Sequence, residues 1–338
     1  MKPKDRDFIE TIDELLFCIV GYLHPPDRYT AYLKYVPNKD GQWSRGETQY
    51  KRILPYYHVS QVENSYSYLD KHYPGYIYHC PVRNIRVSTV PKTEVKQYYS
   101  PQKRLKSIIE EPQDKLEYKL QELVNVLSCI SGLDNDDFGV TGSILTSSHN
   151  LEFSDMDITV YGMEASRILK KMILKKRGTD KLIQPISLTN RESWSKSRSK
   201  IFPLDPQEFM TFADKRWNYG YFQGTYFSIH SVRTDGEITE NYGDRTYTPL
   251  YNVKGEAVIS DSSESIFLPA IYKLEDIKLM GEDLPVTSLI SFESIFGDMF
   301  GEGDRVSFSG KLENISDGTY QIVIGGAGST VSYIKKYV

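Results

Sequence analysis

The first hundred residues alternate short apolar runs with polar turns. Residues 15–22 and 29–36 are rich in strand-forming side chains, and a Pro-Pro-Asp turn at 25–27 separates them, which predicts a β-hairpin. The pattern also predicts a helix near residues 66–72 and a strand over 85–90. We therefore expect residues 1–100 to form a small α+β module, followed by a polar hinge over 101–112.

Helical spacing begins after this hinge. Apolar residues recur every three or four positions from Leu116 to Ile130, Asp114 stands where an N-cap is needed, and Gly132 follows as a stop signal. A second amphipathic helix is expected after Gly162. Its apolar side carries Ala165, Ile168, Leu169, Met172 and Ile173.

Two apolar runs lie between these helices. The first, 138–141, leads into Gly142 and Ser143, and after eleven residues the second run, 155–161, begins with Asp155 and Asp157. Carboxylates two positions apart on a strand face the same side of a sheet. Because like charges so close repel each other, the pair is expected to bind a cation, and Mg²⁺ is the ion that such hard oxygen ligands suit.

A Gly-Ser turn and a D-x-D strand at this spacing, with a helix before and after them, resemble the signature of the DNA polymerase beta nucleotidyltransferase superfamily. The resemblance covers about residues 113–233. It implies a mixed sheet with flanking helices, a nucleoside triphosphate held by Gly142 and Ser143, and two Mg²⁺ ions bound by Asp155 and Asp157. The implied reaction transfers a nucleoside monophosphate to an acceptor hydroxyl.

Many members of that superfamily place a third carboxylate on a later strand. The candidate strand here, 226–233, carries no acid, and His230 occupies the position where one is expected. Three alternatives follow. His230 replaces the acid as a catalytic ligand or base, or an acid from the following loop (Asp235, Glu237 or Asp244) completes the site, or the protein is a catalytically degenerate nucleotide- or RNA-binding protein.

Charge is distributed unevenly along the chain, whose net charge is −4. Residues 163–233 hold fourteen basic and six acidic residues, with Trp194, Trp217, Tyr219 and Tyr221 among them. Cations for phosphates and aromatic rings for bases are typical of a nucleic-acid groove, although a solvated helix face also carries such charges. RNA, tRNA-like in our leading interpretation, is the expected acceptor. Its expected contacts are Lys170, Lys171, Lys175, Lys196, Arg198, Lys215 and Arg216.

The last segment, 234–338, is acidic and rich in short strands, with runs at 254–259, 305–312 and 319–325. Short strands joined by glycine-containing turns predict a small β-barrel, and its negative charge favours a protein partner over a nucleic-acid backbone. No run of about 18 apolar residues indicates a membrane span, and the N-terminus lacks an apolar signal core. We expect a cytoplasmic α+β protein in which the nucleotidyltransferase-like domain lies between the α+β module and the barrel.

Overall fold

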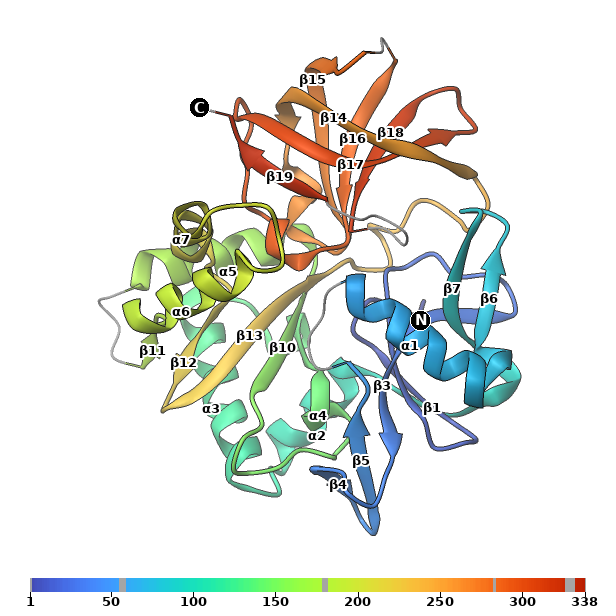
Figure 1. The fold of residues 1–338 in the computed structure, drawn as a ribbon. Helices are drawn as coiled ribbons and strands as arrows, with labels where there is room; N and C mark the ends of the chain where they lie inside the picture. The colour runs from blue at the N-terminus through green and yellow to red at the C-terminus, as the bar shows by residue number, and fades with distance from the viewer. Residues whose placement is uncertain (1, 55–58, 178–181, 282–283, 326–331, 338) are drawn as a thin grey trace. The chain divides into compact units, whose positions relative to one another are not determined.

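The protein is described by a computed structural model that covers all residues except 1, 55–58, 178–181, 282–283, 326–331 and 338 (Figure 1). It has an α+β fold with several sheets and, in the described residues, seven α-helices. The chain forms two compact units, each assembled from three separate segments. The first unit comprises 1–55, 88–186 and 217–239, and the second comprises 56–87, 187–216 and 240–338.

The N-terminal sheet of the first unit has the strand order β4-β5-β3-β2-β1-β8, and residues 89–91 of β7 pair with β3. The predicted hairpin is confirmed, since β2 and β3 pair antiparallel. Several shorter strands around it were not predicted. The strands are β1 (Phe8–Thr11), β2 (Leu16–Ile19), β3 (Arg28–Pro37), β4 (Trp43–Arg45), β5 (Thr48–Arg52), β7 (Ile85–Pro91) and β8 (Val95–Tyr99). Strand β6 (Ile77–Cys80) belongs to the second unit.

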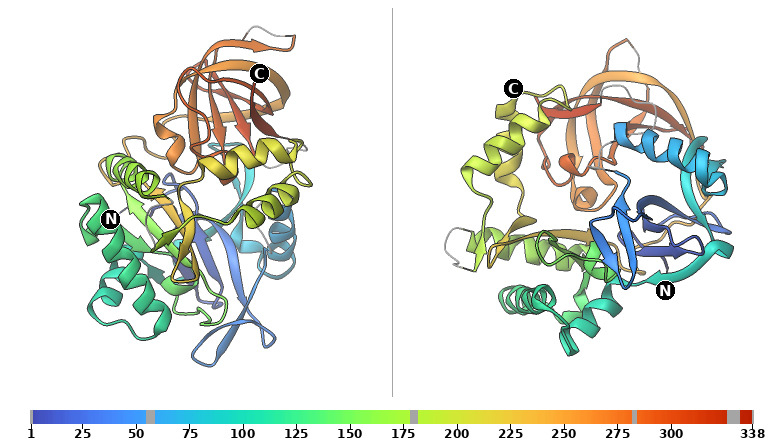
Figure 2. Two further views of the ribbon diagram at one scale, coloured as in Figure 1. Left: turned by 90° about the vertical axis from the view of Figure 1, so that its left-hand side faces the viewer. Right: turned by 60° about the horizontal axis from the view of Figure 1, so that its bottom comes forward.

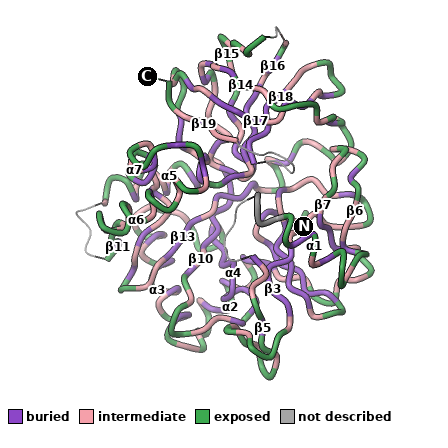
Figure 3. Tube along the Cα trace, in the orientation of Figure 1, coloured by how far each residue is buried: buried purple, intermediate pink, exposed green. Residues whose placement is uncertain are grey.

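The central sheet of the first unit has the order β11-β12-β13-β10-β9. Strand β10 runs antiparallel to β9 and parallel to β13, and β13 runs antiparallel to β12. Strands β10 and β13 are mostly buried, as Figure 3 shows. The bounds are β9 (Phe138–Val140), β10 (Met156–Tyr161), β11 (Ile183–Gln184), β12 (Tyr219–Phe222) and β13 (Thr225–Val232).

Helices α3 (Lys115–Ser131) and α5 (Met163–Lys176) contact each other, and α5 also contacts β10 and β13. The predicted ends of α3 are confirmed. The Asp114 carboxylate accepts hydrogen bonds from the N–H groups of Leu116 and Glu117, and Gly132 adopts the left-handed conformation.

The expected polar hinge at 101–112 is wrong, because Pro101–Glu110 forms helix α2. Proline is well suited to the first turn of a helix, and Leu105 and Ile108 share one buried side. Lys103, Arg104 and Lys106 made this segment look polar in sequence. The short helix α4 (Gly142–Leu145) connects β9 to the loop that precedes β10.

The second unit contains a sheet in which β14, β15, β16, β18 and β17 form a closed ring of pairings, since β17 also pairs with β14 (Figure 2). Strands β16 and β18 are parallel, and β19 extends the sheet beside β17. The bounds are α1 (Val59–His72), α6 (Leu188–Arg198), α7 (Pro206–Lys215), β14 (Tyr247–Asp261), β15 (Ala270–Leu279), β16 (Val286–Ser291), β17 (Arg305–Ile315), β18 (Tyr320–Ile324) and β19 (Tyr333–Lys336).

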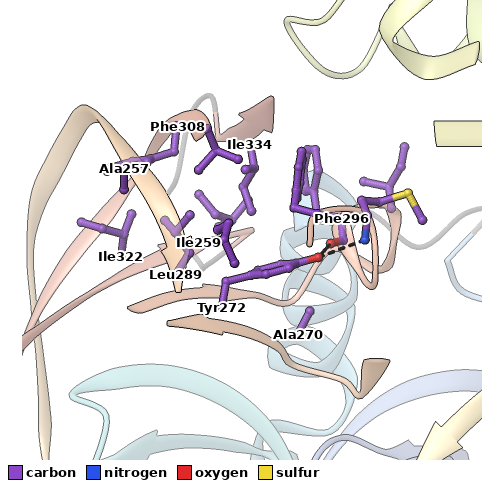
Figure 4. Packing of buried hydrophobic residues seen from close by; sticks show 14 of the residues in the cluster. Ala257, Ile259, Ala270, Tyr272, Leu289, Phe296, Phe308, Ile322 and Ile334 are labelled. Atoms are coloured by element: carbon purple, nitrogen blue, oxygen red, sulfur yellow. Dashed lines mark hydrogen bonds between the residues drawn. The ribbon is translucent and has the colours of Figure 1, made fainter. Parts of the chain in front are cut away.

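Side chains from all five ring strands fill the core of this sheet, among them Ile259, Leu289, Phe308 and Ile322 (Figure 4). Tyr272 is fully buried in this core, where its hydroxyl donates a hydrogen bond to the Phe296 carbonyl at 2.6 Å and accepts one from the Met299 N–H at 3.1 Å. A buried polar group is tolerated in such a core because its bonds are made internally. None of the described helices has both the length and the apolar character needed to cross a bilayer.

A buried carboxyl group lies at the start of the first unit. Asp7 on the approach to β1 is 4 % exposed, and its Oδ2 accepts hydrogen bonds from the Tyr98 hydroxyl and from the Lys4 N–H. Burial raises the pKa of Asp7 to about 7, against the lowering effect of these two hydrogen bonds. The folded chain therefore holds a proton here that the unfolded chain releases near pH 4.

We expect the free energy of unfolding to fall as pH rises from about 4 to about 7, because in this range the folded state binds the proton and the unfolded state does not. The contribution of Asp7 is at most roughly 1.4 kcal/mol per pH unit. Urea denaturation of wild type and Asp7→Asn at pH 4.5–7.5 measures it. The variant should lose this part of the pH dependence. If unfolding free energy changed with pH equally in the two proteins, Asp7 would not be the group that holds the proton.

Candidate functional site

The turn at Gly142 and the start of β10 lie in contact. Gly142 has a φ of +69°, and a β-carbon placed on it would lie 2.4 Å from Asp157 Oδ2. The N–H of Thr141 donates to the Asp157 carbonyl at 2.8 Å, which fixes the two segments side by side. The structure thus brings the predicted glycine and the second aspartate together, and only glycine satisfies both the backbone conformation and the space.

Asp155 lies one residue before β10 and is exposed to solvent. Partial desolvation and the negative charge of Asp157 raise the pKa of Asp155 to about 6, while the positive charges of Lys34 and Arg52 oppose the shift. Because the side chain remains open to water, we regard the like charge of Asp157 as the more important cause. The two carboxylates therefore interact, as their spacing predicts.

Asp157 is only partly exposed and stays ionised. Burial raises its pKa, but contacts with His230 and Ser228 and the charge of Lys34 outweigh burial and bring the pKa below its usual range. The Ser228 hydroxyl donates to Asp157 Oδ1, and Ser228 Oγ lies 2.9 Å from His230 Nε2. His230 Nε2 itself is 3.8 Å from Asp157 Oδ1.

His230 is neutral at pH 7. Burial and the positive charge of Arg6 lower its pKa to about 4, although Asp157 acts in the opposite direction. Since the Ser228 proton is directed to Asp157, Nε2 of His230 donates to Ser228 Oγ, and Nδ1 of the ring is left as an acceptor. A chain of hydrogen bonds thus runs from His230 through Ser228 to Asp157.

Two cations from the N-terminal sheet act electrostatically on this acidic pair, and sequence reasoning missed both: Lys34 lowers the pKa of both aspartates, and Arg52 lowers that of Asp155. Lys34 on β3 is 5 % exposed, and its Nζ lies 5.1 Å from the centre of the Phe8 ring. Arg52 is the last residue of β5. A lysine inside a buried strand was the available signal, because such a charge is rarely buried without acidic groups nearby.

The acids suggested as a third carboxylate are engaged elsewhere. Asp235 Oδ1 pairs with Lys4 Nζ at 2.5 Å. Glu237 accepts hydrogen bonds from the N–H groups of Met163 at 2.7 Å and Thr234 at 2.8 Å. Asp244 accepts one from the Asn241 N–H at 2.7 Å and belongs to the second unit. The residues that lie beside Asp157 on the neighbouring strand β13 are Ser228 and His230.

Ser143, the other predicted nucleotide-binding residue, is buried in α4. Its hydroxyl lies 3.4 Å from Ser154 Oγ, and its carbonyl accepts a hydrogen bond from the Ser148 N–H at 2.9 Å. These contacts link the Gly-Ser turn to both ends of the loop that leads to Asp155. Ser143 therefore holds this loop in place.

The predicted RNA contacts divide between the two units. Lys170, Lys171 and Lys175 lie on α5 in the first unit, where Lys171 and Lys175 are exposed. The others belong to the second unit, and two of them make contacts there: Lys215 Nζ donates to the Met299 carbonyl at 2.7 Å, and the Arg216 guanidinium lies 5.1 Å from the Trp194 ring centre. The remaining two, Lys196 and Arg198, are on α6.

A second group of potential metal ligands consists of Asp114, Glu117 and His149, whose ligand atoms lie within 4.8 Å of one another. Asp114 caps α3, and its Oδ2 also accepts a hydrogen bond from His149 Nε2 at 2.7 Å. Glu117 accepts from the Arg104 guanidinium through one oxygen and from the Gln113 N–H through the other. With these oxygens and this nitrogen already engaged, the group stabilises the start of α3.

Comparison with known proteins finds a relative over the whole chain. The chain is 28 % identical over 345 residues to the uncharacterized protein MJ1086 of Methanocaldococcus jannaschii, and the match covers all of this chain and 99 % of that protein. No protein-family model matches the chain. No solved structure matches it either.

The contact between Gly142 and Asp157 can be tested against a matched glycine. Gly132 has a similar φ of +74°, but a β-carbon there would meet no atom within 4 Å. Gly132→Ala should cost about 1–2 kcal/mol of unfolding free energy from backbone strain alone. Gly142→Ala should cost more, because the added methyl group must also displace the Asp157 carboxylate. Urea denaturation of both variants measures the difference, and equal losses would show that the contact is unimportant.

Proposed function

We propose that this chain is a Mg²⁺-dependent nucleotidyltransferase that transfers a nucleoside monophosphate from a triphosphate to an acceptor hydroxyl. The observation that carries the proposal is the contact of the left-handed Gly142 turn with Asp157, next to Asp155. A helix before β9, a helix after β10 and the parallel pairing of β10 with β13 support the proposal, although β11, α6, α7 and β12 intervene between α5 and β13. An RNA acceptor is part of the proposal, and the exposed lysines of α5 support it.

The donor set fits one Mg²⁺ ion. Asp155 is open to solvent, and Asp157 Oδ2 faces the Gly142 turn while its Oδ1 is engaged by Ser228. Carboxylate oxygens beside water are the ligands that Mg²⁺ favours, and the ion would neutralise charge on the phosphates during transfer. The resemblance implies a second ion as well. Where its third carboxylate ligand is expected, this chain has the Ser228 hydroxyl and the His230 imidazole, and these two groups suit Mg²⁺ less well than a carboxylate does.

The chain itself would contribute position and charge. Ser228 holds the Asp157 carboxylate in a fixed orientation, and His230 holds Ser228. Lys34 and Arg52 supply positive charge near the aspartates, where a triphosphate would arrive. In the proposed reaction the acceptor hydroxyl gives its proton to solvent water and its oxygen bonds to the α-phosphorus. The bond from that phosphorus to the oxygen that bridges the α- and β-phosphates breaks, and pyrophosphate leaves.

Labelled-nucleotide incorporation tests this proposal. Wild type should transfer label from at least one of the four triphosphates to an RNA mixture with Mg²⁺, and Asp155→Asn with Asp157→Asn should lower the rate about 1,000-fold or more. Asp136→Asn, an exposed aspartate on the loop before β9, is the control and should transfer as wild type does. Undiminished transfer by the double variant would exclude these carboxylates from the reaction.

A second candidate function is nucleotide binding without transfer. The observation that favours it is the position of Ser228 and His230 beside Asp157, together with the engagement of Asp235 and Glu237 in other contacts. A neutral histidine with a pKa near 4 holds a proton weakly and is therefore a poor general base near pH 7. Such a protein would keep the turn and the aspartates for binding alone.

The two candidate functions differ in whether pyrophosphate is released. For a transferase we expect pyrophosphate release with Mg²⁺ and RNA present, and His230→Gln should reduce kcat more than it changes KM. For a binding protein, calorimetry should detect nucleotide binding while no pyrophosphate appears over hours. Release of pyrophosphate by wild type at a rate lost in the double aspartate variant would exclude the binding-only candidate.

The closed ring of β14–β18 resembles an OB-type barrel, a class that includes nucleic-acid-binding domains. Its segment of the chain is acidic, however, with seventeen acidic and eight basic residues over 234–338. This charge opposes binding to a phosphate backbone. Within this proposal, the barrel therefore binds a protein partner.

A further inference from the structure

Three tyrosines share the face of the central sheet that carries Asp157. We call Tyr219, Tyr221 and Tyr226 the tyrosine platform. Tyr219 on β12 lies opposite Ser228 on β13, and Ser228 lies opposite Asp157 on β10. Residues opposite each other in a sheet project from the same face. The hydrogen bond from Ser228 to Asp157 confirms that these two side chains do so.

The rings of the platform lie against one another. Tyr219 and Tyr226 are stacked with ring centres 6.2 Å apart and an interplanar angle of 29°, and Tyr221 meets Tyr226 edge-on at 5.5 Å. All three side chains are partly exposed. The other face of the same two strands carries Phe222 and Phe227, which are buried, so that the core of the sheet is filled without the tyrosines.

The platform is held rigidly. Gly220 stands between Tyr219 and Tyr221, and a β-carbon on it would lie 2.8 Å from the Gln184 carbonyl and 3.0 Å from the Phe227 ring. The close approach fixes β12 against β11 and against the buried face of β13. Aromatic rings on a fixed strand pair lose little freedom when a flat molecule stacks on them.

The distance from the aspartates to the platform suits a nucleotide. Two strand spacings, roughly 10 Å, separate the backbones at Asp157 and Tyr219. Met156 pairs with Phe227, and one residue earlier on each strand stand Asp155 and Tyr226. In a nucleotide the α-phosphate and the base are separated by one ribose. A phosphate at the aspartates therefore places the base over the tyrosines.

We propose that the tyrosine platform stacks against the base of the nucleoside triphosphate whose phosphates bind at Asp155 and Asp157. This inference rests on the proposed function and adds the recognition of the base. Stacking does not read hydrogen-bonding groups, so all four bases are accepted. Purines, with the larger ring surface, bind more tightly than pyrimidines.

Isothermal titration calorimetry with Mg²⁺ present tests the inference with three probes, namely ATP, UTP and inorganic triphosphate. Tyr226→Ala should weaken ATP binding about 10-fold or more, weaken UTP binding less, and leave inorganic triphosphate unchanged. Tyr226→Phe keeps the ring and should bind ATP within about 2-fold of wild type. Tyr118→Ala, which removes a tyrosine 56 % exposed on α3, is the control and should change nothing.

Five outcomes would overturn the inference. Equal loss of ATP and inorganic triphosphate in Tyr226→Ala indicates a structural role, and unchanged ATP binding excludes the platform while leaving the proposed function intact. If Tyr226→Ala weakens a single-stranded oligoadenylate but not ATP, the platform binds the acceptor. If wild type binds neither ATP nor inorganic triphosphate, or if Asp155→Asn with Asp157→Asn does not weaken either, the proposed function fails as well.

Discussion

The structure of the first unit around β10 depends on holding two carboxylates, Asp155 and Asp157, beside the turn at Gly142, which has no side chain. Asp155 and Asp157 repel each other, and a β-carbon at position 142 would collide with the second of them. The fold tolerates this arrangement because Ser228, reached through a parallel strand pairing, donates to Asp157, and because Lys34 and Arg52 supply opposing charge. A group of residues that opposes folding in this way is typical of a functional site rather than of a structural one.

The site combines segments that are distant in the chain. The lysine and the arginine come from the N-terminal sheet, the aspartates from the middle of the chain, and the serine, histidine and tyrosines from β12 and β13. The aspartates lie at the start of β10, and the other groups lie on β3, β5, β12 and β13. In this arrangement the N-terminal sheet contributes charge to the site of the central sheet, and the hairpin β12–β13 contributes the aromatic surface beside it.

The sequence allowed accurate prediction where one local rule decided the structure. Asp114 and Gly132 delimit α3 because capping is a property of a few neighbouring residues. The proximity of the Gly-Ser turn to the aspartates was implied by the resemblance to a known family, and Gly142 does lie beside Asp157. Contacts that depend on how distant strands pair were not predictable. Nothing in the sequence singled out Ser228, which reaches Asp157 only because β13 pairs in parallel with β10. Helix α2 was missed because its buried side consists of few residues among charged ones.

The order of the segments also bears on how the protein is made. The first unit is interrupted twice, and its last segment, 217–239, contains β12 and β13. A nascent chain of 200 residues already carries both aspartates and the glycine turn, yet it lacks the strand that supplies Ser228 and His230. During synthesis the acidic pair is therefore exposed without its stabilising neighbour until the chain has passed residue 232, and the site cannot assemble before about two thirds of the protein has left the ribosome.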